Sequence, residues 1–523
     1  MDGMRNLAIM KSMSWSISWQ FLQRVFFIVG LATMPVMTGK FIFPIAGNHI
    51  GLLFFTAGIL IWGIEMYCTR KSLTAGEKRG FLFLGLMFLW ALICTVAGVL
   101  FYPSFANMNL NQMVNFRNLY YNVIGIYPEL TELDFVKGFL LYRGIRNAFA
   151  SVLSTYFISL WIYHIYQKDW KMGFRDLQRA LVGAGVFLIT YSIIEVGFLS
   201  GNYTCKEILE IINGKVFDVA GSQGWWPPLF WDHLQVRSLF PEPSHLGIFL
   251  GMAIPAFFSI FFLSKDKTCF VYLLVYSCYV MMLFMSKART GTVVFSIELF
   301  MFIVWLLFYR RFLSGKRIIS FLCITLGAFL ISFTIMTNFH PIDNKVKDRN
   351  DVTSVSSYVQ NNIASAVGNQ RSNSTRKVNM LATLKVGLSH PLTGTGIYMA
   401  NEYIEKQIPQ EDKRGEIALW IDYMIKEGPI QSGFPDTNHF VTVLAEQGII
   451  GEILFLTPLA TVCILLYRQR YILKKMEVTA LFVSFVGLTM ALCANYDHIW
   501  LFVITGLLFS TLYPRRDRND YNG

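Results

Sequence analysis

The sequence predicts an all-α protein that spans a membrane about twelve times, and composition is the first observation behind this prediction. Of the 523 residues, 54% are hydrophobic and only 15% are charged, whereas a soluble domain averages roughly a quarter charged residues. The second observation is that the apolar residues fall in long runs. Most of these runs reach the ~20 residues that a helix needs to cross ~30 Å of hydrocarbon.

Twelve apolar segments are expected to form the membrane-spanning helices. The first, at 17–37, is too long for the apolar part of a cleavable signal peptide, and no small-residue cleavage site follows it. We therefore expect this segment to remain as a span. The other predicted spans are, in order, 42–64, 81–101, 147–166, 180–199, 244–264, 269–285, 292–309, 318–337, 440–467, 477–494 and 497–513.

The basic residues indicate the orientation of the chain. About half of the 45 Lys and Arg residues lie in short connections on one side of the predicted bundle. Cytoplasmic connections of membrane proteins gather such residues, so both termini are expected in the cytoplasm and the long connections outside. The net charge of +12 is then a signal of topology, and no nucleic-acid partner is expected.

The chain divides into three predicted parts. Residues 1–337 are expected to form a bundle of nine spans, 338–439 a large external loop with short helices, and 440–523 the last three spans and a cytoplasmic tail. Of the eight cysteines, only Cys205 falls in a predicted external loop, so no internal disulfide framework is expected. The sequence carries no HExxH, paired CxxC, phosphate-binding loop or dinucleotide fingerprint, so we predict neither a metal site nor a cofactor.

The first candidate site on the external side is LFPEPSHLG, from Leu239 to Gly247. Pro243 suits the first turn of a helix, which would put Glu242 and His245 within one turn of each other at the outer end of the sixth span. A carboxylate beside an imidazole can act as a general base. The alternative is a helix cap next to an interfacial histidine.

Two further external segments carry arginines. The short turn SKARTG, from Ser286 to Gly291, holds Arg289 at the membrane surface, and the alternative is a snorkelling side chain. In the long loop, Ser374 or Thr375 is expected to cap a helix with Arg376 in its first turn. An anion there would receive free backbone N–H groups and a guanidinium together. The alternative is a solvated basic residue.

The last candidate is DTNHF, directly before the tenth predicted span. His439 stands at the membrane entrance, and Glu446 lies about two turns further in. Ionisable residues within a span usually face protein or water, and His439 is placed to act on a substrate at the surface. The alternative is a histidine that only forms a hydrogen bond at a helix start.

Taken together, these segments resemble the O-antigen ligase and Wzy polymerase superfamily. The pattern is Arg376, thirteen residues, HPLTGTG (His390 to Gly396), a polar interval, and NHFVTVLAEQGIIG (Asn438 to Gly451). The SKARTG turn and the large external loop fit the same resemblance. It implies a GT-C-like glycosyltransferase bundle in the bacterial inner (cytoplasmic) membrane, with its active site on the periplasmic or extracellular side.

The resemblance also implies substrates and roles. Donor and acceptor would be glycans on undecaprenyl diphosphate within the lipid bilayer, and a chain-length regulator protein is a further candidate partner. Family arginines are thought to hold the diphosphate, which assigns that role to Arg289 and Arg376, with Arg371 as a neighbouring alternative. The candidate catalytic groups are those named above: Glu242, His245 and His439.

One difference from the ligases favours a polymerase. Ligase-type relatives carry His-Asn some nine residues before the glutamate that corresponds to Glu446. Here Thr437 stands at that position, and His439 follows two residues later, which is ~200° around a helix if the helix has already begun there. We therefore expect a polymerase in which Glu242 or His245 takes part and which joins repeat units into O-antigen, capsule or exopolysaccharide, with ligation to lipid A core as the alternative.

A flippase or transporter is the alternative from a different class. The sequence disfavours a twelve-span carrier, because its long loop lies outside, between spans nine and ten. It also lacks a DRxGR-like turn after the second span.

Overall fold

The computed structural model describes residues 18–37, 49–70, 72–101, 110, 114–216, 228–231, 234–263, 269–309, 315–340, 371–428, 433–494 and 499–514. These residues fold into helices joined by turns, with one isolated bridge between Met37 and His49. The all-helical class predicted from the sequence is therefore confirmed for this part of the chain.

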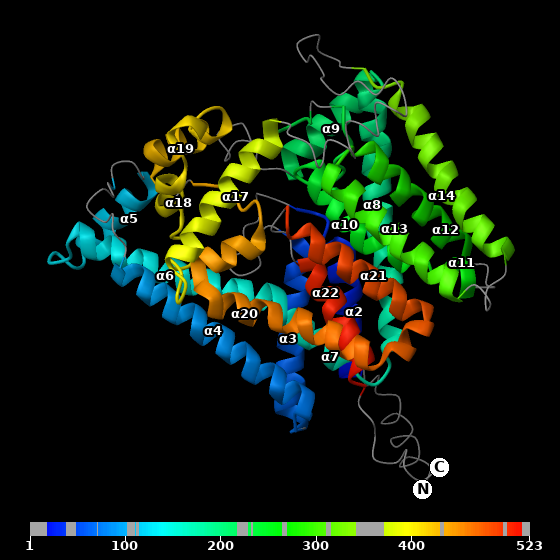
Figure 1. Ribbon diagram of the computed structural model, residues 1–523, viewed down its shortest axis with the longest axis horizontal. Coiled ribbons are helices and arrows are strands. Elements are labelled where there is room, and N and C mark those ends of the chain that lie inside the picture. The colour runs from blue at the N-terminus through cyan, green and yellow to red at the C-terminus, as the bar shows by residue number, and fades with distance from the viewer. Residues whose placement is uncertain are drawn as a thin grey trace, which may run out of the picture.

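The first half of the chain supplies the helices drawn from blue to dark green in Figure 1. They are α2 (Trp19–Thr33), α3 (Ile50–Thr69), α4 (Ala75–Phe101), α5 (Val114–Ile124), α6 (Glu132–Val152), the π-helical turn η3 (Leu153–Phe157), α7 (Ile158–Tyr166), α8 (Trp170–Leu199), α9 (Tyr203–Val216), α10 (Pro243–Ala256) and α11 (Ile260–Leu263). Helix α6 continues through η3 into α7, so the predicted span at 147–166 is the second half of a longer helical stretch.

The second half supplies the remaining helices, drawn from green to red. They are α12 (Cys269–Met285), α13 (Arg289–Tyr309), α14 (Gly315–Met336), α17 (Arg371–Ser389), α18 (Asn401–Gln407), α19 (Glu416–Glu427), α20 (His439–Arg468), α21 (Met476–Ala491) and α22 (Ile499–Leu512), with short 3-10 turns at Gln410–Asp412 and Arg470–Lys474.

The protein is a multi-pass membrane protein. Among the described residues, eight helical stretches are long and apolar enough to cross a bilayer, namely Ile50–Thr69, Ala75–Phe101, Glu132–Tyr166, Trp170–Leu199, Pro243–Phe262, Arg289–Phe308, Gly315–Met336 and His439–Arg468. The shorter apolar helices α12, α21 and α22 coincide with three more predicted spans, and α2 coincides with the first. The count of twelve stays a prediction.

Helix α10 lies at the centre of the larger part of the bundle. The stretch Pro243–Phe262 is buried along its whole length, as expected for a helix that is apolar on every side. It packs mainly against α13 and α21, and also against α12. Figure 1 shows these helices together in the green and red part of the molecule.

The helices of the predicted external loop gather beside the first part of α20. Helices α17, α18 and α19 share a small apolar core that includes Val386, Ile404 and Ile417, and this core reaches Ala445 of α20. Figure 1 shows the three helices beside α20, near α5 and α6. The loop helices are therefore fixed directly to a membrane helix.

One expected helix boundary was wrong. Helix α17 begins at Arg371 and not at Ser374 or Thr375, so Arg376 lies in its second turn. The helix ends at Ser389, directly before the HPLTGTG turn, as the sequence predicts.

Candidate functional site

Arg289 contacts the first turn of α17. Its Nη1 donates a hydrogen bond of 3.1 Å to Oδ1 of Asn373. The guanidinium of Arg376 is near enough to repel that of Arg289 electrostatically. Two segments that are far apart in the sequence thus bring two cations together, and an anion between them would relieve their repulsion. The alternative arginine, Arg371, begins α17, but its side chain lies outside the described part of the structure.

Glu242 and His245 lie at the same end of the bundle as Arg289. Helices α10 and α13 touch at Gly247 and Gly291, where a Cβ added to Gly291 would stand only 2.6 Å from Cα of Gly247. Both helices begin within about one turn of this contact. The close approach therefore sets the start of α10, with Glu242 as its N-cap residue, beside the start of α13.

The Glu242 and His245 side chains face each other. Nε2 of His245 lies 3.7 Å from Oε1 of Glu242, which also accepts a hydrogen bond from the Ser244 hydroxyl. Glu242 is partly exposed, whereas His245 is only 3% exposed. The carboxylate is thus the member of this pair that a substrate can reach.

Buried hydrogen bonds of Glu195 and Arg237 hold the loop that leads to Glu242. The Glu195 carboxylate on α8 accepts the backbone N–H groups of Arg237 and Ser238. The buried Arg237 guanidinium donates to the carbonyls of Pro228, Leu229 and Pro241. Because these polar groups are paired inside the protein, the loop has a fixed path up to residue 242.

His439 forms a pair with an aspartate that the sequence analysis did not single out. Helix α20 begins at His439, and Nδ1 of this residue donates a 2.9 Å hydrogen bond to Oδ2 of Asp436. Oδ1 of Asp436 accepts a 3.0 Å hydrogen bond from the Thr442 hydroxyl. A carboxylate on one ring nitrogen fixes the orientation of an imidazole. The spacing Asp-x-x-His at a helix start was the available signal.

Thr437 and His439 make different contacts. Nδ2 of Asn379 on α17 donates to the carbonyl of Pro435 at 2.9 Å and to Oγ1 of Thr437 at 3.3 Å. The Thr437 side chain therefore contacts α17, while His439 contacts Asp436. The two positions are not equivalent, but the helical rotation expected from the sequence is not the reason, because Thr437 and Asn438 precede α20, which begins at His439.

Helix α20 is broken at Gly448, which has φ 67° and ψ −172°. The break withdraws several backbone groups from the helical ladder. The turn after α17 and one indole pair with them: Thr395 N–H donates to Ala445 O (2.9 Å), Gly396 N–H to Glu446 O (3.0 Å), Trp90 Nε1 to Gln447 O (3.0 Å), and Ile449 N–H to Pro391 O (2.8 Å). An unpaired backbone group costs several kcal/mol in a membrane, so the HPLTGTG turn makes this break possible.

The break also positions Glu446. Oε1 of Glu446 accepts a 2.9 Å hydrogen bond from the backbone N–H of Tyr398. Tyr398 itself has φ 60°, a left-handed conformation that is rare for such a residue and often found at functional sites. Arg143 of α6 stands over the Tyr398 ring, with Cζ 5.7 Å from its centre. Burial, followed by the charge of Glu446, raises the pKa of Tyr398, so its hydroxyl stays protonated at neutral pH.

Asp436, His439, Glu446 and Tyr398 line a cavity of about 780 Å³. Its lining comes from α6 and η3, from the start of α20 and from the turn before α18, with further residues of α3, α4, α17 and α18. The polar side chains that line it are Asn147, Ser151, Ser154, Thr155, Thr383, Asn401, Asp436, His439, Thr442, Glu446 and Gln447, together with the hydroxyls of Tyr156 and Tyr398. The volume falls within the ~300–1,000 Å³ usual for ligand sites.

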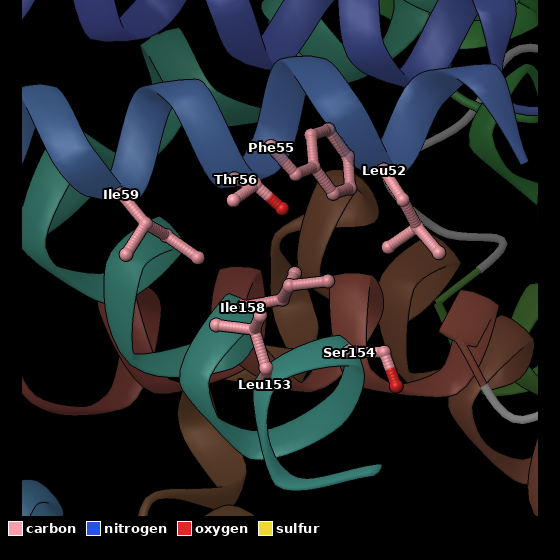
Figure 2. Close-up of a pocket in the computed structure, with 7 residues that line it drawn as sticks. All are labelled: Leu52, Phe55, Thr56, Ile59, Leu153, Ser154 and Ile158. Atoms are coloured by element: carbon pink, nitrogen blue, oxygen red, sulfur yellow. The ribbon is translucent and has the colours of Figure 1, made fainter. Parts of the chain in front are cut away.

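A narrow apolar crevice adjoins this cavity at the π-helical turn. Figure 2 shows Leu52 and Phe55 of α3 opposite Leu153 and Ile158, with Ser154 beside them. The crevice has no room for a water molecule, and Leu52 and Ser154 line the larger cavity as well. Single π-helical turns inside helices are frequent at functional sites.

Helix α17 links the two arginines to the cavity. Along this helix come Arg376, then Asn379, which contacts the segment before His439, and then Thr383, which lines the cavity. Seven residues of helix span ~10 Å, so the backbone of Arg376 lies about that far along α17 from that of Thr383. His439 and both arginines were predicted from sequence motifs, whereas Asp436, Tyr398 and Arg143 were not, and Glu446 had no predicted role.

The family model described as O-antigen ligase matches residues 272–456. No curated protein matches the chain. The matched segment extends from α12 to the second part of α20, so it contains Arg289, Arg376, the turn at 390–396 and the Asp436–His439 pair. Glu242 and His245 precede it.

Proposed function

We propose that this chain, which belongs through residues 272–456 to the O-antigen ligase and Wzy polymerase superfamily, polymerises oligosaccharide repeat units carried on undecaprenyl diphosphate. Its class of activity is glycosyl transfer within a membrane. The product would be O-antigen, capsule or exopolysaccharide. The reaction would take place at the outer face of the bacterial inner membrane, with both termini in the cytoplasm.

The observation that carries this proposal is the contact between Arg289 and the start of α17, which brings Arg376 close. Two guanidiniums can bind the oxygens of a diphosphate with paired hydrogen bonds, which a point charge does less well. Arg376 stands about 10 Å along α17 from Thr383, which lines a polar cavity that also contains an oriented imidazole. A lipid-linked sugar needs both features, a cationic site for its diphosphate and a base near its anomeric carbon.

The mechanism is a direct displacement. The acceptor hydroxyl gives its proton to His439, whose other ring nitrogen is held by Asp436. The hydroxyl oxygen forms a bond to the anomeric carbon of the donor as the bond from that carbon to the phosphate oxygen breaks. Undecaprenyl diphosphate leaves with the bonding electrons, and Arg289 and Arg376 stabilise its charge. The anomeric configuration is inverted.

Glu242 and His245 are the second candidate base. They flank the start of α13, where Arg289 lies, and Glu242 is partly exposed. His439 is the stronger assignment because it lines the cavity, whereas His245 is buried in α10. Substitution of His439 in one variant and of Glu242 in another separates the two assignments, because only loss of the true base should abolish transfer.

Ligation of the glycan to lipid A core is the alternative product. The description of the matched family favours it, since the match covers the arginines and His439. Thr437 favours polymerisation, because its side chain contacts α17 and does not line the cavity.

The deciding experiment uses the purified full chain in detergent micelles with synthetic undecaprenyl-diphosphate repeat units. A polymerase forms a ladder of products from these units alone. A ligase leaves them unchanged until lipid A core is added and then joins the glycan to it. A flippase makes no product in micelles, where there are no compartments, and such a result overturns the proposal.

A further inference from the structure

The cavity between η3 and the first part of α20 differs in charge from the arginine pair. None of the described residues that line it is Lys or Arg, and two of them, Asp436 and Glu446, are carboxylic acids. The described lining therefore supplies no cation that could offset the charge of a diphosphate. The cavity is therefore suited to an uncharged ligand with many hydroxyl groups, and the diphosphate belongs at the other end of α17.

The lining residues supply both kinds of contact that a sugar needs. Asn147, Ser151 and Glu446 offer hydrogen-bonding groups from opposite walls. Tyr398 and Phe434 add aromatic rings, whose faces can cover the apolar side of a sugar ring. Polar groups that converge in a partly aromatic cavity are typical of small-molecule sites.

Glu446 and Asp436 have different roles in this cavity. Both oxygens of Asp436 are engaged by neighbours, one by His439 and the other by Thr442, so this residue positions the imidazole. Glu446 has one oxygen held by the Tyr398 N–H, and the held carboxylate lines the cavity. Tyr398 adopts a strained conformation to make this contact, which fixes the direction of the carboxylate.

We infer that this cavity is the acceptor-sugar subsite, in which the Glu446 carboxylate accepts hydrogen bonds from acceptor hydroxyls and Tyr398 packs against the sugar ring. The inference rests on the proposed function for the direction of transfer. An acceptor here approaches the anomeric carbon from the side opposite the arginine-bound diphosphate. His439 is the lining residue at the start of α20, next to the segment that Asn379 contacts, and so lies between the two substrates.

The test separates the acceptor from the donor. The acceptor is the repeat-unit oligosaccharide as an octyl glycoside, which lacks a diphosphate and cannot donate. The donor is a lipid-diphosphate repeat unit whose accepting hydroxyl is methylated. We expect Glu446→Gln to raise the KM for the glycoside at least about tenfold, because an oxygen that accepts hydrogen bonds is replaced by an amide nitrogen that only donates them, and to leave the donor KM unchanged.

Glu452→Gln is the matched control, since Glu452 lies on the same helix but does not line the cavity. Ser151→Phe is a second variant, because Ser151 is exposed on α6 and a larger side chain there projects into the cavity without disturbing the core. Ser151→Phe should raise the KM for the acceptor glycoside in the same way. An unchanged acceptor KM in both variants, or a raised donor KM in Glu446→Gln, overturns the inference.

Binding of the octyl glycoside, measured directly by saturation-transfer NMR in detergent, distinguishes this inference from the proposed function. Binding that weakens in Glu446→Gln and Ser151→Phe but not in Glu452→Gln supports the subsite even if no transfer is seen. If the wild type transfers glycan and all three variants bind the glycoside as well as the wild type does, the proposed function stands and the subsite is rejected. A wild-type protein that does not bind the glycoside also rejects it.

Discussion

Oδ2 of Asp436 lies 2.9 Å from Nδ1 of His439, at the point where the chain enters helix α20. The Thr442 hydroxyl, one turn into the helix, holds the other carboxylate oxygen. The imidazole that lines the cavity is therefore oriented by a carboxylate, which is itself fixed by the helix. This arrangement makes His439 a base with a defined direction and makes Asp436 its positioning residue.

Replacement of Asp436 by Asn should lower the rate of transfer by about 10²–10⁴-fold, the usual contribution of a positioned general base, while leaving both KM values unchanged. The readout is single-turnover transfer by purified protein. Asp436→Glu should restore part of the rate, and Asp422→Asn, at an exposed position of α19, serves as the control. A rate loss that comes with equally weakened substrate binding would indicate a structural role only.

Loss of either arginine should weaken binding of the lipid diphosphate. Hydrogen bonds to a charged group are worth ~1.5–3 kcal/mol, which corresponds to about a 10- to 100-fold rise in the Kd for undecaprenyl diphosphate in Arg289→Ala and Arg376→Ala. Arg289→Lys should recover only part of the affinity for undecaprenyl diphosphate, because a lysine cannot form the paired hydrogen bonds of a guanidinium. Lys377→Ala, at the next exposed position of α17, is the control. Wild-type affinity in both alanine variants would reject the diphosphate assignment.

Gly448→Ala should destabilise the protein. Its combination of φ 67° and ψ −172° is essentially limited to glycine and costs ~1–3 kcal/mol for other residues, and the added carbon would stand 2.1 Å from the carbonyl oxygen of Leu392. We expect thermal unfolding in detergent to occur several degrees lower than in the wild type. Gly138→Ala on α6, where the added carbon meets open space, should not lower it. Equal unfolding temperatures for the two variants would show that the contact with Leu392 is not rigid.

The orientation of the chain can be tested with single cysteines. In a chain freed of its native cysteines, Gln410→Cys and Ser72→Cys both place a thiol at an exposed position. A membrane-impermeant maleimide applied to cells with a permeabilised outer membrane should label the first and not the second. Labelling of Ser72→Cys alone would place the arginines and the cavity on the cytoplasmic side and would end the proposal.

Much of the helical scaffold was predictable, because the apolar runs that produce membrane helices are long and local in the sequence. The predicted spans coincide with helices in the described part of the chain, but several ends differ. Helix α2 ends at Thr33, before the predicted end at 37, and the span predicted at 244–264 is interrupted after Ala256. At α6, polar residues continue the helix beyond its apolar part. Helix α6 begins at Glu132, ahead of the predicted span at 147–166, because Thr131 caps it and accepts a hydrogen bond from the Asp134 N–H. A hydropathy pattern does not register such an extension.

The site was only partly predictable for a related reason. Arg289 and Arg376 were recognised from short motifs, and their proximity is a tertiary fact that the resemblance implied. The Tyr398 conformation and the break at Gly448 arise from contacts between the 390–396 turn and α20, which no local pattern encodes. Glu446 was visible as a charge within a span, but its direction depends on that break.

The most direct measurement of the central claim is the amount of undecaprenyl diphosphate released per glycosidic bond formed by the purified protein in detergent. Direct displacement at the arginine pair predicts one molecule released for each new bond in the wild type, and neither release nor bond formation above background in the Arg289→Ala, Arg376→Ala double variant. Chain growth without matching release of the lipid diphosphate, or wild-type growth by the double variant, would contradict the account.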